Sequence, residues 1–325
     1  MAPRRALITI AAVAGAVAAP FLVYPDFLLQ ALCFALFASA FNLLFGYAGV
    51  LSFGHAAFFG AGAYVAAYLM IVLAAPPLAA LALGALVAAA LGGVIGALAI
   101  RRSGVYLAMI TLSLAEIVYF VALHVPATGG EDGLQGVPRG RLFGVIDLED
   151  ARAMYFFALL IYLGGMAFLY RVAHSPYGRI LAAIKQNEER ATSLGYHVGR
   201  YKLLAFVLSA AFSGLAGALK ALSLHFAALG DVDWHTSGEV ILMTLLGGLG
   251  TLAGPSVGAF LVVTLADQLA GLGEWVNFVL GAIFVLCVLL FRRGIVGEAA
   301  AWLHGGGAPP RRPWRRWQRA EARER

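Results

Sequence analysis

Charged residues are scarce in this sequence. Only 12% of the 325 residues are Asp, Glu, Lys or Arg, while 62% are hydrophobic. A soluble globular protein has roughly 25% charged and about 45–50% apolar residues. The polar groups of this chain are too few to cover a soluble protein of its size. The composition therefore predicts an all-α, polytopic bundle of transmembrane helices.

The basic excess, a formal net charge of +6, belongs to one end of the chain. Residues 1–291 hold 14 basic and 14 acidic side chains, whereas residues 292–325 hold nine Arg and three Glu. This distribution does not indicate a nucleic-acid-binding surface, and we expect no nucleic acid among the partners. The tail, residues 298–325, is predicted to be either a disordered cytoplasmic extension or a basic anchor on anionic membrane lipid.

Motifs for catalysis and for metal binding are also lacking. The sequence has no glycine-rich loop ending in Gly-Lys-Ser or Gly-Lys-Thr, so the chain cannot hydrolyse ATP through a P-loop. No two histidines or cysteines have metal-ligand spacing, and a solvated or interfacial role is expected for the scattered histidines. Cys33 and Cys287 both lie in apolar runs, which gives no support for a disulfide framework. We expect neither an enzyme nor a resident cofactor or metal.

Apolar runs close to the roughly 20 residues that span a bilayer recur along the chain. One further run, 240–270, is too long for a single upright helix and is interrupted by glycines and Pro255. Two shorter helices that meet at this interruption would give ten spans, with nine or eight as the alternatives. The other eight runs are 6–24, 27–45, 57–75, 78–100, 105–123, 153–170, 203–224 and 276–291.

The first 26 residues resemble a secretory signal peptide, because Arg4 and Arg5 precede an apolar stretch that ends in Ala-Ala-Pro. A cleaved signal ahead of many spans would be unusual. We therefore expect residues 1–26 to form an uncleaved first transmembrane helix, followed by a membrane domain over residues 27–297.

Orientation follows from the excess of Lys and Arg in cytoplasmic loops. By this rule Arg4 and Arg5, Arg101 and Arg102, the segment 171–202 and the arginine tail face the cytoplasm. The acid-rich loops 124–152 and 225–239 face the outside. Ten spans with both termini in the cytoplasm satisfy these assignments.

Two glycine-punctuated stretches lie in opposite halves of the chain, at 46–62 and at 247–258. Such a pair is typical of a structural repeat that brings interrupted helices together near a transport path. Small residues that simply allow helices to pack closely would give the same pattern. Both interpretations remain open from the sequence.

The segment 171–202 predicts a short amphipathic helix. Ser175 and Pro176 are typical of a helix start, and Gly195 is typical of the residue after a helix end. Apolar residues recur on one face, with charged residues on the other; the apolar ones are Ile180, Ile184, Ala191 and Leu194. This helix can lie on the bilayer or dock into a groove of a partner.

The same segment resembles the coupling segment of permeases from branched-chain amino acid ABC transporters of the LivM type. Further matches to that family follow in order at 41–64, 104–117, 128–133, 201–218 and 246–255, so the resemblance covers about residues 27–297. The residues that carry the coupling pattern are Gly178, Arg179, Ala183, Ile184, Lys185, Asn187, Glu188, Ala191, Leu194 and Gly195.

The resemblance implies a permease subunit of an importer in the bacterial inner membrane. Such a subunit pairs with a second homologous permease, docks two ATP-binding subunits through the coupling residues, and receives its small-molecule substrate from a periplasmic solute-binding protein. Branched-chain or related amino acids are the expected substrates. Relatives also handle other amino acids, urea or other amides, and small carboxylates, and nothing in these spans selects among them.

Polar residues within the spans are candidates for the translocation path, because they are costly in hydrocarbon and tend to face a cavity or the bundle interior. Hydrogen bonds between helices are the alternative role for each. The candidates are Asn42, Ser52, Thr111, Ser113 and Glu116. An ion-coupled secondary transporter is the alternative function. It would be expected to show several intramembrane acids, whereas only Glu116 is clearly mid-span.

Overall fold

The structure of the chain is a computed structural model that describes residues 14–21, 23–142, 144 and 146–269, together with positions 271, 279, 281, 282, 285 and 294–298. About half of the expected first span, 6–24, and most of the last span, 276–291, fall outside the described residues. So does most of the basic tail.

Six helices of the described part are long and apolar enough to cross a membrane. This confirms the predicted all-α, polytopic bundle. The first of them, α2, continues into a single π-helical turn, η2 (Leu43–Tyr47). The six are α2 (Pro25–Asn42), α3 (His55–Val72), α4 (Pro77–Ala99), α5 (Val105–His124), α6 (Ala151–His174) and α9 (Val198–Leu224).

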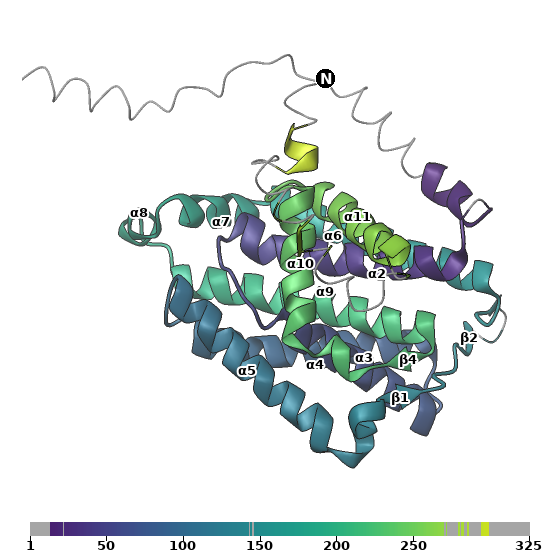
Figure 1. Cartoon of the computed structure of the whole chain (residues 1–325). Coiled ribbons are helices and arrows are strands. Elements are labelled where there is room, and N and C mark those ends of the chain that lie inside the picture. The colour runs from purple at the N-terminus through teal and green to yellow at the C-terminus, as the bar shows by residue number, and fades with distance from the viewer. Residues whose placement is uncertain are drawn as a thin grey trace, which may run out of the picture.

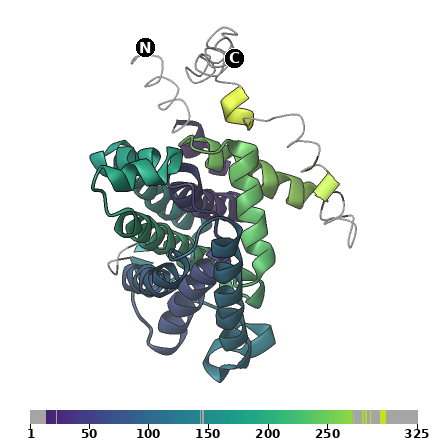
Figure 2. The same cartoon turned by 90° about the vertical axis from the view of Figure 1, so that its left-hand side faces the viewer.

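The glycine-interrupted run 240–270 forms two helices, as expected, namely α10 (Trp234–Gly247) and α11 (Gly254–Leu269). With 14 and 16 residues, each is shorter than the roughly 20 residues that span a bilayer upright. Figures 1 and 2 show α10 running across the direction of α2 and α9 rather than alongside them. The ten-span count therefore stays a prediction.

Two groups of small elements lie at opposite ends of the bundle (Figure 1). At one end are the short helices α7 (Pro176–Gln186) and α8 (Glu188–Ser193). At the other end are the connections after α5 and α9, which are joined by the antiparallel pair β1 (Leu134–Gln135) and β4 (Phe226–Ala227). The remaining short elements are η1 (Ala19–Phe21), η3 (Pro126–Thr128), η4 (Gly130–Asp132), β2 (Arg141–Leu142), β3 (Ile146–Asp147) and η5 (Leu229–Asp231).

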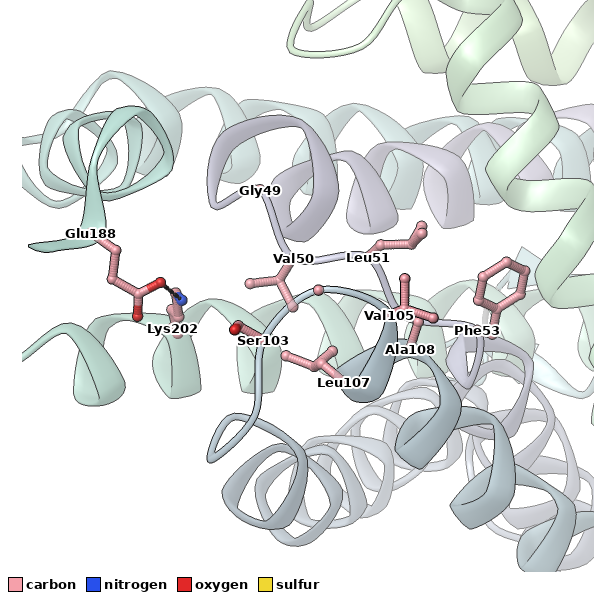
Figure 3. Close-up of a pocket in the computed structure, with 11 residues that line it drawn as sticks. Gly49, Val50, Leu51, Phe53, Ser103, Val105, Leu107, Ala108, Glu188 and Lys202 are labelled. Carbon is pink, nitrogen blue, oxygen red and sulfur yellow. Dashed lines mark hydrogen bonds and ion pairs between the residues drawn. The ribbon is translucent and has the colours of Figure 1, made fainter.

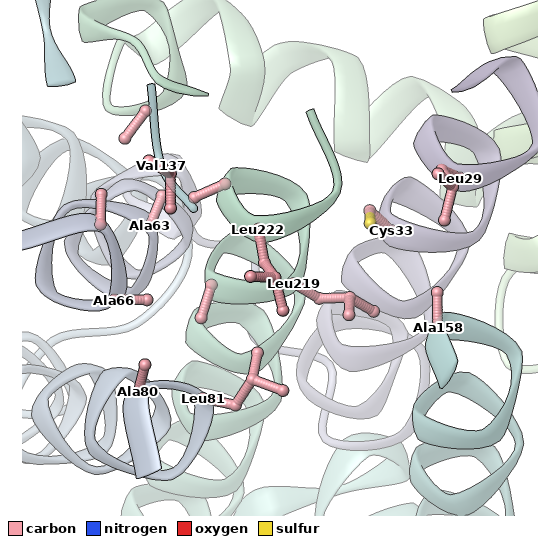
Figure 4. Close-up of a cluster of buried hydrophobic side chains, with 14 of the residues drawn as sticks. Leu29, Cys33, Ala63, Ala66, Ala80, Leu81, Val137, Ala158, Leu219 and Leu222 are labelled. Carbon is pink, nitrogen blue, oxygen red and sulfur yellow. The ribbon is translucent and has the colours of Figure 1, made fainter. Parts of the chain in front are cut away.

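Helix α9 is the centre of the bundle and packs against α2, α3 and α4. Figure 4 shows its Leu219 and Leu222 between α3 and α4 on one side and α2 and α6 on the other. Glycines allow this approach. A Cβ atom at Gly217 would overlap the carbonyl of Phe59 on α3, and one at Gly62 would overlap the backbone of α9. Close packing through small residues, one of the two interpretations of the glycine pattern, is therefore present along α9.

Candidate functional site

The segment that resembles a coupling segment consists of two helices. Ser175 caps the first, since its Oγ accepts a hydrogen bond from Gly178 N at 3.3 Å, and Pro176 occupies the first turn. Asn187 interrupts the segment with an extended backbone (φ −159°), and its Oδ1 accepts from Arg190 N at 2.9 Å to cap α8. The prediction of one continuous helix was wrong at this residue. Asn followed by two Glu starts a helix more favourably than it continues one.

The buried face of the two helices packs on the start of α9. Ile184 and Ala191 form a small cluster with Val198, and Ile180 packs against its edge. Leu194, expected on this face, is instead 71% exposed, because α8 ends at Ser193. Gly195 has a φ of +87°, which suits its predicted place after the helix end.

The segment also carries an open hollow beside this cluster. The hollow has a volume of about 260 Å³, and it lies between two arginines and apolar side chains, some of them exposed. Tyr196 and Leu194 are both exposed there. The lining residues are Arg179, Ile180, Ala183, Asn187, Arg190, Ala191, Leu194 and Tyr196. Gly178 is buried against the end of α6 and does not line the hollow. Four further residues of the predicted coupling pattern do not line it either, namely Ile184, Lys185, Glu188 and Gly195.

Glu188 contacts its own chain. Its Oε2 accepts from Lys202 Nζ at 2.6 Å, which ties α8 to α9. The Lys202 side chain is 10% exposed and that of Glu188 is 49% exposed. The ion pair closes one end of a pocket of about 450 Å³ that the loops at 49–53 and 103–105 also line, as Figure 3 shows. The remainder of this pocket is largely apolar.

Lys185 also contacts its own chain, at the end of α2. Its Nζ donates a 2.6 Å hydrogen bond to the carbonyl of Gly46 in the π-helical turn. The aliphatic stem lies against Gly49, where a Cβ atom would come within 2.9 Å of Lys185 Cγ. Burial at this contact lowers the pKa of the Lys185 ammonium from its ordinary value. A cation at a helix C-terminus satisfies a carbonyl that has no partner within the helix.

Asn42 joins the two glycine-punctuated stretches. Its Oδ1 accepts from Gly250 N at 3.0 Å, and its Nδ2 donates to Thr251 O at 2.8 Å. Gly46 lies directly beside this amide, because a Cβ atom there would overlap Asn42 Oδ1. The two interruptions therefore meet in the structure, as one of the two interpretations of the glycine pattern proposed.

Ser52 and Thr111 hold the unwound stretch between η2 and α3. The Ser52 Oγ accepts from Gly54 N at 3.3 Å, and the Thr111 Oγ1 accepts from Phe53 N at 3.2 Å. Both side chains are fully buried. They satisfy backbone groups that no helix or strand pairs, as irregular backbone at membrane depth requires.

Ser113 and Glu116 lie elsewhere, on the exposed face of α5. Met109 and Phe120 are exposed on the same face. The predicted path residues thus form two groups, one buried at the unwound stretches and one on an open helix face. Their role in a translocation path stays a prediction.

Several buried polar residues were not expected from the sequence, among them Lys220, Asp231 and His55. Lys220 on α9 forms an ion pair of 2.8 Å with Asp231 in η5. A lone Lys within an apolar spanning run signals a buried functional or structural charge. His55, expected to be solvated or interfacial, is fully buried, with its Nε2 2.9 Å from Ser209 Oγ.

A bundle of long apolar helices, with unwound glycine-rich segments at its centre and an open pair of short helices at one end, defines a multi-pass membrane protein of the permease class. Residues 23–288 match the family described as the permease component of branched-chain amino acid transport systems, and the chain belongs to this family. The function is therefore transport across a membrane rather than catalysis.

Relatives of known function are also transport permeases. The chain is 28% identical to the high-affinity branched-chain amino acid permease LivM of Escherichia coli K12, over 90% of this chain and 75% of that protein. It is likewise 28% identical to LivM of Salmonella typhimurium, over 86% and 72%. The ribose import permease RbsC of Bacillus subtilis is 28% identical over 54% of each chain. No solved structure matches the chain.

Proposed function

We propose that this chain is the transmembrane permease subunit of an ABC importer for branched-chain or related amino acids. It pairs with a second homologous permease subunit in the bacterial inner membrane and docks two ATP-binding subunits. A periplasmic solute-binding protein delivers the substrate, and ATP hydrolysis in the partner subunits drives its passage. Family membership and the two LivM relatives support this assignment.

The open face of α7 and α8 is the observation that carries the proposal. These helices project at one end of the bundle (Figure 1), and the hollow along them combines arginines with exposed Leu194 and Tyr196. Apolar side chains that are exposed outside the apolar spans mark a docking surface. An ATP-binding subunit seated on this face covers them and places its acidic groups near Arg179 and Arg190.

The exposed face of α5 supports pairing with a second permease. A carboxylate that faces lipid is costly, so Glu116 points toward protein or a water-filled passage. Ser113 lies on the same open face. A second permease against α5 would enclose both side chains and leave a passage between the subunits.

The names of three relatives bear on the class of substrate. Two are named for branched-chain amino acids and one for ribose, so the fold alone does not choose between these classes. The amino-acid assignment rests on the greater coverage of the chain by the LivM relatives.

Purification of the chain from its native membrane, followed by reconstitution, tests the proposal. The expected result is co-purification of a second permease and P-loop ATPases. In proteoliposomes, labelled leucine, isoleucine or valine enters only when ATP and the solute-binding protein are present. Arg179→Glu is expected to lose the ATPases from the complex, while Arg171→Glu, an exposed arginine at the end of α6, retains them.

A chain that purifies alone and moves solute in response to an ion gradient without ATP would overturn the proposal in favour of a secondary transporter. ATP-dependent uptake of ribose but not of amino acids would retain the importer and overturn the substrate class.

A further inference from the structure

A line of contacts leads from α7, through the end of α2, to the loop between α10 and α11. It begins at Lys185 and runs through the Gly46 carbonyl and the Asn42 side chain to Gly250 and Thr251, in the loop between α10 and α11. The contacts at the two ends of this line are hydrogen bonds of 3.0 Å or less, and the first involves a charged donor, which gives the stronger class of bond. The middle link is close packing, because a Cβ atom at Gly46 would overlap Asn42 Oδ1.

The elements along this line are suited to moving together. The Asn42 side chain is buried, and both its oxygen and its nitrogen are satisfied by the same loop. The loop therefore cannot shift without breaking a hydrogen bond to a buried amide. At Gly46 the helix is already wound as a π-helical turn, a feature frequent at functional sites. At Gly49 the absence of a side chain lets the Lys185 stem pack on the backbone.

The line also continues beyond the loop. Helix α10 begins near α3, where Ser237 Oγ accepts from Ala56 N at 2.9 Å. The start of α3 adjoins the unwound stretch that Ser52 and Thr111 hold. A displacement of α7 therefore reaches both unwound stretches through bonded contacts.

We infer that Lys185 is a positioning residue that transmits movement of α7, through Gly46 and Asn42, to the loop between α10 and α11. The inference rests on the proposed function, since it takes the movement of α7 to come from docked ATP-binding subunits. It differs from the role implied by resemblance, in which Lys185 contacts the ATPase. In this structure the ammonium points into its own subunit.

Two variants in the complete reconstituted complex test the relay. Lys185→Met keeps the aliphatic stem and removes the donor, and Asn42→Ala removes the buried amide. Both are expected to assemble with the ATPases and to retain basal ATP hydrolysis. Uptake per ATP hydrolysed is expected to fall about tenfold, which corresponds to a typical coupling free energy between sites. Lys185→Arg, which keeps a cationic donor, is expected to recover most of the loss.

Arg171→Met is the matched control. It removes an exposed cation at the end of α6 whose side chain forms no hydrogen bond or ion pair with another described residue, and uptake per ATP is expected to be unchanged. In the double variant Lys185→Met with Asn42→Ala, the loss of uptake per ATP is expected to be no greater than in Asn42→Ala alone. Both substitutions interrupt the same line of contacts, so their effects do not add.

Normal coupling in Lys185→Met, or losses that multiply in the double variant, would overturn the relay. So would loss of the ATPases from Lys185→Met, because that result assigns the residue to docking. If Asn42→Ala does not accumulate in the membrane, Lys185→Met and Lys185→Arg decide alone. A wild-type chain that never binds ATPases refutes the proposed function itself and is recognised before any variant is made.

Discussion

Lys220 of α9 and Asp231 of η5 form an ion pair with a Nζ–Oδ2 distance of 2.8 Å, and their side chains are only 6% and 10% exposed. The same carboxylate accepts from Ala228 N at 3.0 Å, and the ammonium lies 4.0 Å from the ring centroid of Phe226. The pair therefore fastens the turn after β4 to the end of the central helix.

Breaking this pair from one side is expected to destabilise the protein strongly. Asp231→Asn leaves the Lys220 ammonium buried without a counter-charge, and removal of one partner of a buried pair costs about 3–5 kcal/mol. The midpoint of thermal unfolding in a fixed detergent measures the loss. The double variant Lys220→Met with Asp231→Leu is expected to recover most of it, because no buried charge remains. A single variant as stable as the wild type would contradict this role.

The glycine contacts along α9 are expected to be intolerant of a methyl group. Gly217→Ala forces the new Cβ atom against the Phe59 carbonyl, and overpacking of this kind costs about 1–3 kcal/mol. Gly164→Ala in α6 is the matched control, since a Cβ atom there meets no heavy atom within 4 Å. Its thermal midpoint is expected to equal or slightly exceed that of the wild type. Equal losses in both variants would contradict the packing role, because helix propensity favours Ala over Gly at both positions.

The Glu188–Lys202 pair is expected to matter for transport more than for stability. Glu188 is about half exposed, so Glu188→Gln should cost less than about 1 kcal/mol of unfolding free energy. Because the pair ties α8 to α9, ATP-dependent uptake is expected to fall about fivefold. The exchange Glu188→Lys with Lys202→Glu restores the contact and most of the uptake. An exchanged variant that stays as poor as Glu188→Gln would assign Glu188 to a contact outside this chain.

Glu116 is expected to face water rather than lipid. In a chain without its native cysteines, Glu116→Cys should react rapidly with a membrane-impermeant thiol reagent in the assembled complex. Leu86→Cys, on the exposed face of α4, should react slowly because lipid covers it. Glu116→Gln should reduce uptake as well. Slow labelling combined with full uptake would remove Glu116 from the path.

Local signals in the sequence identified the ends of the coupling segment, and only part of its interior. Ser175 and Gly195 act as expected, because a cap and a positive-φ glycine depend on nearest neighbours alone. The sequence also contains a local signal for the interruption at Asn187, because a residue that favours the helix N-cap is followed there by two acidic residues. It was missed because apolar spacing continued across it, and spacing cannot distinguish one helix from two with the same phase.

Contacts between distant segments could not be derived in this way. The glycine pattern was compatible with a meeting of the two interruptions and with close packing alone, and nothing local to Asn42 indicates that its amide binds Gly250 and Thr251. Asp231 was assigned to an outer loop because residues 225–239 are acid-rich, and only the path of the chain after β4 brings it to Lys220. Such pairings depend on the packing of the whole bundle.

The close approach of helix backbones at Gly62, Gly217 and neighbouring glycines limits how the molecule can move. Helices packed this closely cannot rotate or slide past one another without steric clashes. Helices α3, α4 and α9 are therefore expected to move as one rigid unit. The freedom needed to open and close a passage then belongs to the chain that is neither helix nor strand, at 48–54 and 248–253. Alternating access in this protein is therefore expected to be a hinge motion about two short unwound segments, with the glycine-packed unit as its fixed frame.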